Sequence, residues 1–393
     1  MRLGDICSKI GSGATPRGGK EAYSTSGIPI IRSQNVLDWS FSSNGLAYLN
    51  DEQAKTLSNV EVHQGDILLN ITGDSVARAC IVPSDVIPAR VNQHVAILRP
   101  KEKANATFIL AWLQTNKDLL LKLASSGATR NALTKRMLEG LDINLPSIDI
   151  QNHIAELISL IQSKINLNIK LNGYLEKLVS LEFSRRFKAS TPTIELGKVL
   201  SISTESIKPQ EHAGEIWEHY SIPAYDENRQ PLFELSDGIK SNKYAIDANC
   251  ILISKLNPAT KRIWMPSCTS EHSVCSTEFI VYKPKNPRYK SFYYAAIDSQ
   301  AFTDFLIAHV TGSTGSRQRT QPKATLTYPM PNPGHDAIEG FCAFADPIYK
   351  QIQSNKLESK WLVSLRDALL PKLMSGEIDV SKIDLTQLNS HLA

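Results

Sequence analysis

The stretch DIQNHIAELISLIQSKINLNIKLNGYLEKLVSLEFSRRFK, residues 149–188, decides the fold, because it predicts one long helix. Its apolar residues recur at spacings of three and four, which is the period of one face of an α-helix. A first seam consists of Ile154, Ile158, Ile161, Ile165, Leu175 and Val179, with Asn168 and Asn172 in line. A neighbouring seam consists of Leu157, Leu160, Leu167, Leu171, Leu178 and Leu181. Two seams make a wider face than a two-stranded coiled coil needs, so we expect this helix to contact more than one neighbour.

A second long helix is predicted from about His335 to Ser375. The same spacing recurs there at Ile338, Phe341, Ala345, Ile348, Ile352, Leu362 and Leu369. We expect Asp149 to cap the first helix and Gly376 to end the second. Pro347 and Pro371 are expected to kink or interrupt the second helix, because proline lacks an amide donor and clashes with the preceding turn. The two helices are predicted to pair antiparallel, with a globular half at each end of a rod.

The chain outside the long helices contains an internal repeat. Leu3-Gly-Asp-Ile begins the first half and Leu196-Gly-Lys-Val begins the second, an offset of 196 − 3 = 193. Four further features follow in the same order in both halves: an apolar strand, a strand ending in proline, a loop rich in Gly, Ser, Thr and Arg, and a short strand ending at Pro146 or Pro331. This order predicts two tandem α+β globular domains in a pseudo-two-fold repeat, separated by two long antiparallel coiled-coil helices.

The predicted boundaries place the globular domains at residues 1–148 and 190–334 and the helices at 149–189 and 335–393. Inside the globular domains, residues 108–123 and 292–310 are each predicted to be helical.

Composition limits the class of protein. The 393 residues are 42% hydrophobic and carry a net charge of +4, enough for more than one core but only weak evidence for a nucleic-acid partner. No membrane-spanning run and no signal-peptide core are present, so we expect a soluble cytoplasmic protein. The six cysteines form no Cys-x-x-Cys pair and are expected to be free thiols. Cys268, His272 and Cys275 lack an obvious fourth ligand, so no metal site is predicted.

Polar and cationic side chains in loops are the candidate contacts to DNA. Arginine and asparagine or glutamine make bidentate bonds to guanine and adenine, and cations and bare amides bind phosphate. Plain glycine-rich hairpins and solvated surface loops are the alternative interpretations of the same segments. The candidates are Thr15, Arg17, Lys20, Arg32, Gln34, Asn35, Asn70, Thr72, Arg78, Asn92, Gln93, His94, Arg130, Asn131, Lys135, Arg136, Lys255, Lys261, Arg262, Ser316, Arg317, Gln318 and Arg319.

Catalytic motifs are missing from the sequence. It has no Asn-Pro-Pro-aromatic tetrapeptide or glycine-rich cofactor loop of an adenine methyltransferase, and no Gly-x-Ser-x-Gly elbow. The one Glu-x-Lys, at Glu358-Ser-Lys360, falls inside the second long helix, whereas a nuclease needs such a pair on a strand beside another acid to hold Mg²⁺. The sequence therefore favours a protein that is not an enzyme.

The segment Leu365-Arg-Asp-Ala-Leu-Leu-Pro-Lys-Leu-Met-Ser-Gly-Glu-Ile378 closely resembles the ending of Type I restriction–modification specificity subunits. Several further motifs resemble the target-recognition domains of that family: Leu3-Gly-Asp, Gly13 to Pro16, Gly27-Ile-Pro-Ile-Ile-Arg32, Asn92-Gln-His94 and the basic loop before Leu145-Pro146. The second half departs from the pattern, because it has no Gly-x-Thr-Pro loop and has Ser276-Thr-Glu278 in place of Asn-Gln-His.

This resemblance implies a division of labour. Each globular half would be a target-recognition domain for one half of a split DNA site, and the paired helices would be conserved spacers. Two modification subunits would dock on the helices and bring S-adenosylmethionine, while restriction subunits would bring ATP and Mg²⁺ chemistry; this chain would bind no cofactor. The docking residues would be Leu157, Leu160, Leu167, Leu171, Leu178, Trp361, Leu365 and Leu369. A fused restriction or methylation enzyme, and a helical scaffold that does not bind DNA, remain the alternatives.

Overall fold

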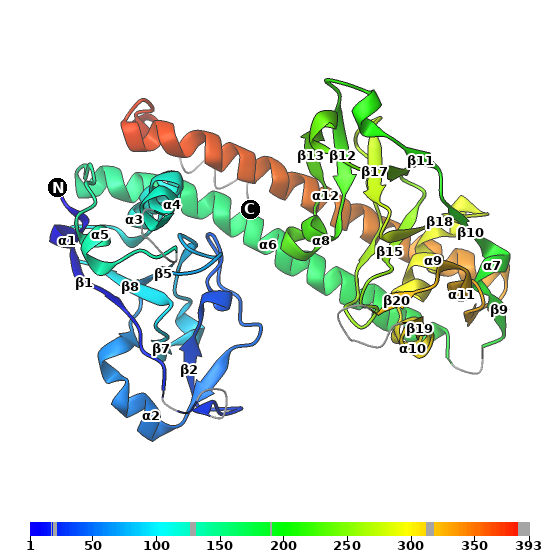
Figure 1. Cartoon of the computed structure of the whole chain (residues 1–393), viewed down its shortest axis with the longest axis horizontal. Coiled ribbons are helices and arrows are strands. Elements are labelled where there is room, and N and C mark those ends of the chain that lie inside the picture. The colour runs from blue at the N-terminus through cyan, green and yellow to red at the C-terminus, as the bar shows by residue number, and fades with distance from the viewer. Residues whose placement is uncertain (17, 19–21, 126–130, 189–190, 312–317, 384–393) are drawn as a thin grey trace. The chain divides into compact units, whose positions relative to one another are not determined.

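The computed structural model describes residues 1–393 apart from 17, 19–21, 126–130, 189–190, 312–317 and 384–393 (Figure 1). The chain forms two compact units. Unit 1 comprises Met1–Leu167 together with Ser359–Ala393, and unit 2 comprises Asn168–Glu358. The division falls inside both long helices, so each unit holds part of each of them, whereas the sequence division treated the helices as separate segments.

Unit 1 contains two four-stranded sheets. The first has the order β1-β8-β5-β6 and is antiparallel throughout: β1 (Cys7–Ser12), β8 (Val95–Pro100), β5 (Ile67–Asn70) and β6 (Ala79–Ile81). The second has the order β3-β2-β7-β4 and includes one parallel pair, β2 with β7: β3 (Ala47–Leu49), β2 (Ile28–Ile31), β7 (Ala89–Val91) and β4 (Glu61–Val62). Leu68 and Ile97 are fully buried among the residues of the second sheet, so the two sheets share one core.

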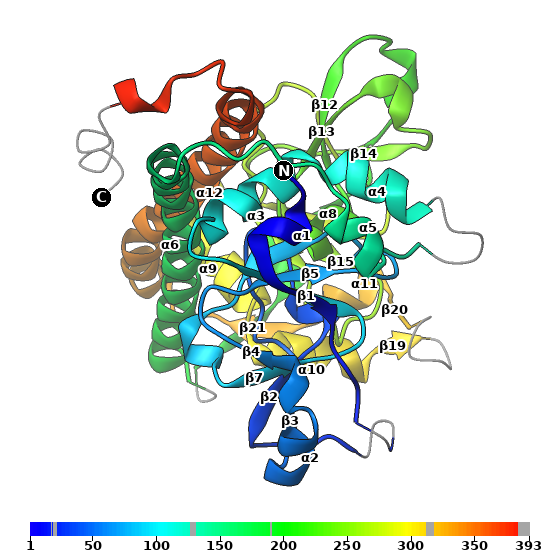
Figure 2. The ribbon, with the colours of Figure 1, turned by 90° about the vertical axis from the view of Figure 1, so that its left-hand side faces the viewer.

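The short helices of unit 1 are α1 (Leu3–Ile6), α2 (Asp51–Thr56), α3 (Ala106–Thr115), α4 (Lys117–Ser125) and α5 (Lys135–Glu139), which can be followed in Figure 2. The single helix predicted over 108–123 is wrong, because α3 and α4 are separated at Asn116. The Asn116 side chain donates to the Trp112 carbonyl at 2.9 Å, a local bond that competes with continued helix.

Unit 2 repeats the first sheet of unit 1. Its order β10-β18-β15-β16 matches β1-β8-β5-β6, with β10 (Leu200–Ser203), β18 (Phe279–Pro284), β15 (Ile251–Ser254) and β16 (Ile263–Trp264). The offset is 251 − 67 = 184 between β5 and β15, and 279 − 95 = 184 between β8 and β18. The predicted internal repeat is therefore confirmed at the level of strand order.

The remaining elements of unit 2 surround this sheet. A five-stranded sheet has the order β11 (Ser206–Ile207), β14 (Lys243–Ala245), β17 (Ser273–Ser276), β12 (Ile216–Tyr220) and β13 (Leu232–Leu235). Two-stranded ladders join β19 (Val310–Thr311) to β20 (Arg319–Thr320) and β21 (Pro329–Pro331) to β9 (Thr193–Glu195). The helices are α7 (Leu196–Val199), α8 (Ile222–Asn228), α9 (Lys290–Ile297), α10 (Gln300–Ala308) and α11 (Pro322–Thr325), so the helix predicted over 292–310 is two helices.

Short 3₁₀ turns connect these elements in both units. They are η2 (Ser33–Asn35), η3 (Ser58–Val60), η4 (Ser84–Val86), η5 (Pro209–Glu211), η6 (Ser236–Gly238), η7 (Pro287–Tyr289) and η9 (Val380–Lys382).

The long helices are α6 (Ile148–Arg186) and α12 (His335–Ser375). In unit 1, the Arg366 guanidinium donates to the Gln162 side chain at 2.7 Å. In unit 2, the Asn168 amide donates to Glu358 at 2.7 Å and the Asn355 amide donates to Asn172 at 2.8 Å. Rising numbers on α6 meet falling numbers on α12 in unit 2, which confirms the predicted antiparallel pairing there.

The first predicted seam of α6 is confirmed as its buried face. Seven of its members are at most 8% exposed, and they include both asparagines: Ile154, Ile158, Ile161, Ile165, Asn168, Asn172 and Val179. Leu175 is partly buried. In unit 1 this face packs with Leu362, Leu370 and Leu373 of α12, and in unit 2 with Ile338, Phe341 and Ala345.

Of three local predictions about the long helices, two are wrong and one is confirmed. Asp149 does not cap α6, because the Ser147 carbonyl already accepts the first bond, from the Gln151 amide, and Asp149 lies in the first turn. Pro347 and Pro371 do not interrupt α12, because buried neighbours on both sides of each proline hold the helix in place. Gly376 ends α12 at a φ of +78°, as predicted.

No helix in the described part of the chain is long and apolar enough to cross a membrane.

Candidate nucleic-acid interface

Three segments of unit 1 meet where the chain leaves β5. The Ile71 amide donates to the His94 carbonyl at 3.0 Å, which joins this segment to the turn before β8. The Leu133 amide donates to the Ile71 carbonyl at 2.8 Å, and the Gly73 amide donates to the Asn131 carbonyl at 3.3 Å. These two bonds join the segment to the foot of the predicted basic loop. We call this meeting point, residues 71–73, 94 and 131–133, the unit 1 junction.

The same three hydrogen bonds recur in unit 2. The Lys255 amide donates to the Glu278 carbonyl at 2.8 Å, the Thr320 amide donates to the Lys255 carbonyl at 2.9 Å, and the Asn257 amide donates to the Gln318 carbonyl at 3.0 Å. Residues 255–257, 278 and 318–320 form the unit 2 junction. In both units, therefore, the residues that directly follow the predicted basic loop are held by the same backbone hydrogen bonds.

One more detail shows that the two junctions are equivalent. Gly73 has a φ of +75° and its counterpart Asn257 has a φ of +47°, a left-handed conformation that glycine and asparagine tolerate best. Arg78 and Arg262 also correspond, because their carbonyls accept the amides of Asn70 and Ser254 at 2.8 and 3.0 Å.

The unit 1 junction presents mainly neutral polar side chains. The Thr72 hydroxyl and the His94 Nδ1 are 2.7 Å apart, and the Gln93 amide lies 3.3 Å from the His94 Nε2. Gln93 is exposed and His94 is half-buried. An imidazole held between a hydroxyl and an amide has a fixed ring orientation, so this group can offer directed donors and acceptors to a base edge.

Cations of unit 1 lie next to this junction. Asn131, Lys135 and Arg136 are exposed, and the Lys135 amine lies 3.5 Å from the Glu139 carboxylate on α5. Such an exposed pair binds weakly, so Lys135 remains available to phosphate. Arg78, which directly precedes β6, is half-buried.

The unit 2 junction is charged. The Arg319 guanidinium lies 3.1 Å from the Glu278 carboxylate. The Lys255 amine donates to the Thr277 carbonyl at 2.6 Å and lies 5.3 Å from the centre of the Tyr244 ring. Burial lowers the pKa of Lys255 from its ordinary value. Gln318 is half-buried beside this group.

Two other predicted cations of unit 2 are neutralised within the unit. The Asp226 carboxylate accepts two hydrogen bonds from the Arg262 guanidinium, at 2.6 and 2.9 Å. The Lys261 amine lies 2.6 Å from the Asp298 carboxylate. Both cations are weaker phosphate candidates than the sequence indicated, because their charge is already compensated.

The start of the glycine-rich segment 11–20, at Gly13 and Ala14, lies against the turn that carries Asn92, Gln93 and His94. The Gly13 amide donates to the Val95 carbonyl at 3.0 Å, and a side chain at Gly13 would come within 1.9 Å of the Val91 carbonyl oxygen. Glycine is therefore required here by close approach of two backbones. Thr15 is half-buried in this loop, while Arg17 and Lys20 lie outside the described residues.

Three predicted base contacts have structural roles instead. Asn35 and Asn70 are 0% exposed, and their amides donate to backbone carbonyls: Asn35 to Ser42 and Asn44, and Asn70 to Ser33 and Val36. Asn92 is 6% exposed, and its side-chain oxygen accepts the His94 amide. These three side chains therefore have almost no surface to offer to DNA.

Arg32 and Gln34 fold the loop that follows β2. The Arg32 guanidinium and the Gln34 amide both donate to the Gly45 carbonyl, at 2.5 and 3.1 Å, and the guanidinium lies 5.6 Å from the centre of the Tyr23 ring. Gln34 is nevertheless exposed, so it keeps a surface that a ligand could reach. Arg130, Ser316 and Arg317 lie outside the described residues.

The predicted docking residues divide by exposure. Leu157 is 3% exposed and belongs to the core of unit 1, and Leu160, Leu365 and Leu369 are partly buried. In contrast, Leu167, Leu171, Leu178 and Trp361 are 51%, 38%, 46% and 61% exposed. Among the described residues of these helices, five further exposed apolar residues stand outside both seams and were missed by the sequence: Ile148, Ile150, Ile169, Tyr174 and Leu357.

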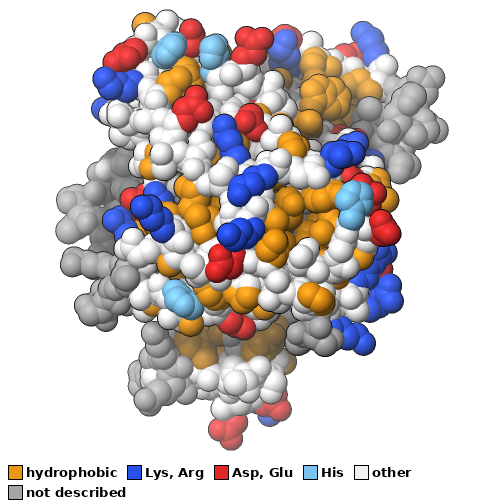
Figure 3. Space-filling model, turned by 90° about the vertical axis from the view of Figure 1, so that its right-hand side faces the viewer, with side chains coloured by type: hydrophobic (Ala, Val, Ile, Leu, Met, Phe, Trp, Pro, Cys, Tyr) orange, Lys and Arg blue, Asp and Glu red, His pale blue; other side chains and the backbone are white. Residues whose placement is uncertain are grey.

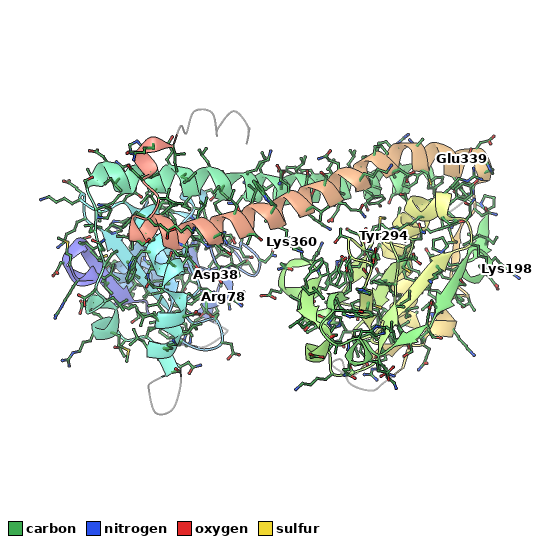
Figure 4. The ribbon with its side chains drawn as sticks, turned by 90° about the horizontal axis from the view of Figure 1, so that it is seen from above. Asp38, Arg78, Lys198, Tyr294, Glu339 and Lys360 are labelled. Atoms are coloured by element: carbon green, nitrogen blue, oxygen red, sulfur yellow. The ribbon has the colours of Figure 1, made fainter. Side chains whose placement is uncertain are left out.

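Charged side chains do not form a field of one sign over the surface drawn in Figure 3, where Lys and Arg are interspersed with Asp, Glu and apolar residues. A small cavity of about 270 Å³ in unit 2 is lined by charged and aromatic groups, including Glu176, Lys356 and Tyr294. Tyr294, labelled in Figure 4, lies on α9. The centre of its ring is 5.2 Å from the centre of the Tyr349 ring on α12. Among the described residues, no group of three or more His, Cys, Asp or Glu side chains is placed to hold a metal ion.

Comparison with known proteins places this geometry in context. Residues 1–177 match the family model of the Type I restriction modification DNA specificity domain. A curated relative, the putative type I restriction enzyme MjaX specificity subunit of Methanocaldococcus jannaschii, is 22% identical over 162 residues, which cover 40% of this chain and 37% of the relative. The match thus spans little more than a third of the relative's length.

A solved structure shares the fold over almost the whole chain. The Type I restriction-modification system S subunit from M. genitalium has a TM-score of 0.55 at 14% identity, with 95% of each chain covered. The HsdS subunit from Thermoanaerobacter tengcongensis has a TM-score of 0.34 at 15% identity, with 96% of each chain covered.

Proposed function

Because residues 1–177 match the family model of the Type I restriction modification DNA specificity domain, we propose that the chain belongs to this family and recognises a bipartite DNA site, one half with each unit. The observation that carries the proposal is the duplicated junction. In unit 1 these hydrogen bonds hold residues 131–133 against the chain that leaves β5. In unit 2 the same hydrogen bonds hold residues 318–320 against the chain that leaves β15. A duplicated binding surface with different side chains suits a target whose two halves differ in sequence.

The partners in this proposal are double-stranded DNA and two modification subunits, with restriction subunits added in a larger complex that acts in the cytoplasm. The exposed apolar residues Leu167, Leu171, Leu178 and Trp361 support docking of another protein along the long helices. Catalysis is assigned to those partners, which would also hold S-adenosylmethionine, ATP and Mg²⁺. This chain supplies recognition and register.

The test is DNA binding by the purified full chain, alone and with its modification partner. Selection from a random duplex library is expected to enrich two short motifs separated by a fixed gap. Affinity should fall steeply as salt rises, because phosphate contacts release counterions.

Two results would favour the alternatives. Binding that ignores both salt and sequence would support a helical scaffold that does not recognise DNA. Methylation of DNA by the chain without any partner would support a fused enzyme.

A further inference from the structure

The two junctions differ in charge although their backbones correspond. By the shared hydrogen bonds, Ile71 of unit 1 is equivalent to Lys255 of unit 2. In the same way His94 is equivalent to Glu278, and Ala132 to Arg319. Unit 1 thus has an apolar residue, an imidazole and a methyl group where unit 2 has two cations and a carboxylate. Since the backbone is the same, the side chains at these positions are what distinguishes the two surfaces.

Arg319 is held from several sides. Its backbone pairs with Thr311 in the β19–β20 ladder and bridges to Leu256. Its guanidinium lies 3.1 Å from the carboxylate of Glu278, and the Glu278 amide donates to the Ser276 hydroxyl at 3.2 Å, which fixes the turn. The Arg319 side chain is still 57% exposed. The Arg319 guanidinium is therefore held in one orientation but is accessible from solvent.

Two buried polar atoms of the same junction lack hydrogen-bond partners among the described residues. They are the side-chain oxygen of Asn257 and the hydroxyl of Thr320. Both atoms are buried, so they belong to the interior of the junction and not to the surface that Arg319 presents to solvent.

Resting on the proposed function, we propose that Arg319 is a specificity-determining residue that recognises a guanine in the half-site of unit 2. Guanine offers two neutral acceptors, O6 and N7, which match the planar fork of arginine. The Glu278 carboxylate compensates the charge of Arg319 and would repel a phosphate at this position. A neutral base edge needs directed donors rather than net charge, so the Arg319–Glu278 pair suits a base better than the backbone.

Glu278 acts as a positioning residue in this arrangement. Removing its carboxylate leaves Arg319 as an uncompensated and less oriented cation. We expect Glu278→Ala to weaken discrimination at the guanine position, and to steepen the salt dependence of binding by about one phosphate contact.

The experiment is selection of full-chain variants from a random duplex library, followed by sequencing. The wild type is expected to enrich a guanine at one position of one half-site. Arg319→Ala and Arg319→Lys should both lose that preference, by about 5- to 100-fold, because lysine keeps the charge without the bidentate fork. Lys323→Ala, at an exposed cation four residues away on α11, is the matched control and should keep the full motif.

The other half-site serves as an internal control for folding, since each variant should still enrich the motif of unit 1. If Arg319→Lys behaves like the wild type while Arg319→Ala weakens binding to all sequences equally, Arg319 contacts phosphate and the inference is wrong. An unchanged motif in all variants would also overturn it. A wild type that enriches no motif would instead contradict the proposed function itself.

Discussion

At the scale of single residues, His219 links the stability of unit 2 to pH. Its Nδ1 lies 2.6 Å from the Glu234 carboxylate across the β12–β13 pair, and its Nε2 is buried without a partner among the described residues. Burial lowers the pKa of His219 below its ordinary value, and the bond to Glu234 only partly opposes this. The folded unit therefore resists a proton that the unfolded chain accepts near pH 6.5.

The sign of the effect follows from linkage. A depressed folded pKa contributes stability above the unfolded pKa, and that stability is lost as the pH falls from about 6.5 toward the folded pKa. We expect the melting temperature of the wild type to fall more between pH 7.5 and 5.5 than that of His219→Gln. His153→Gln, at an exposed histidine of α6, is the control and should follow the wild type. Parallel curves for wild type and His219→Gln would show that another group carries the pH dependence.

Residue types alone do not separate side chains that reach the surface from side chains that hold the fold together. Asn35 and Arg32 look equally suited to base recognition in the sequence, yet Asn35 is 0% exposed and holds the loop together. The difference depends on which carbonyls the folded chain brings within reach, among them Ser42 and Asn44. The Arg319–Glu278 pair joins residues 41 positions apart and was likewise invisible before the fold was known.

At the scale of elements, two buried asparagines, Asn172 of α6 and Asn355 of α12, fix how the two helices pair in unit 2. Asn172 and Asn355 are 8% and 4% exposed, and their side chains are hydrogen-bonded to each other at 2.8 Å. Leucine at these positions would bury more apolar surface but would specify register less well.

A double-mutant cycle tests this role. Asn355→Leu alone should lower the free energy of unfolding by about 1–3 kcal/mol, because Asn172 is left buried without this partner. The double variant Asn172→Leu, Asn355→Leu should recover most of that loss, measured by chemical denaturation. Additive losses in the double variant would mean that the two asparagines act independently.

The long helices were the part of the fold that the sequence predicted best, because a period of 3.6 over ten turns is a strong local signal. The continuity of α12 through Pro347 was not predictable, since it depends on burial of Ala345 and Tyr349 against distant residues. The breaks between α3 and α4 and between α9 and α10 were also missed. Strand order within the sheets was not predicted, because pairing between β1 and β8 is a long-range contact; the repeat predicted only that the same features recur in both halves.

At the scale of the whole molecule, the proposed function gives the long helices a measurable role as spacers. Asn168 of α6 lies opposite Glu358 of α12, at the point where both helices pass from one unit to the other. We expect insertion of four residues in each helix at this point to lengthen both by about 6 Å. The gap between the two recognised motifs should then grow by about two base pairs, since base pairs are about 3.4 Å apart.

Sequencing of selected or methylated sites measures the gap directly. The two half-site motifs should stay the same, which separates a change in spacing from a change in recognition. An unaltered gap with both motifs retained would show that the helices do not set the spacing.

Unit 1 is assembled from two stretches that are far apart in time during synthesis on the ribosome. The α6 face built around Ile158 and Ile161 is translated early, but Leu362, Leu370 and Leu373, which cover it, are translated near the end. A chain that stops before Leu362 exposes that apolar face to chaperones and proteases. Chains that end before Leu362 are therefore expected to be degraded faster than the full-length chain.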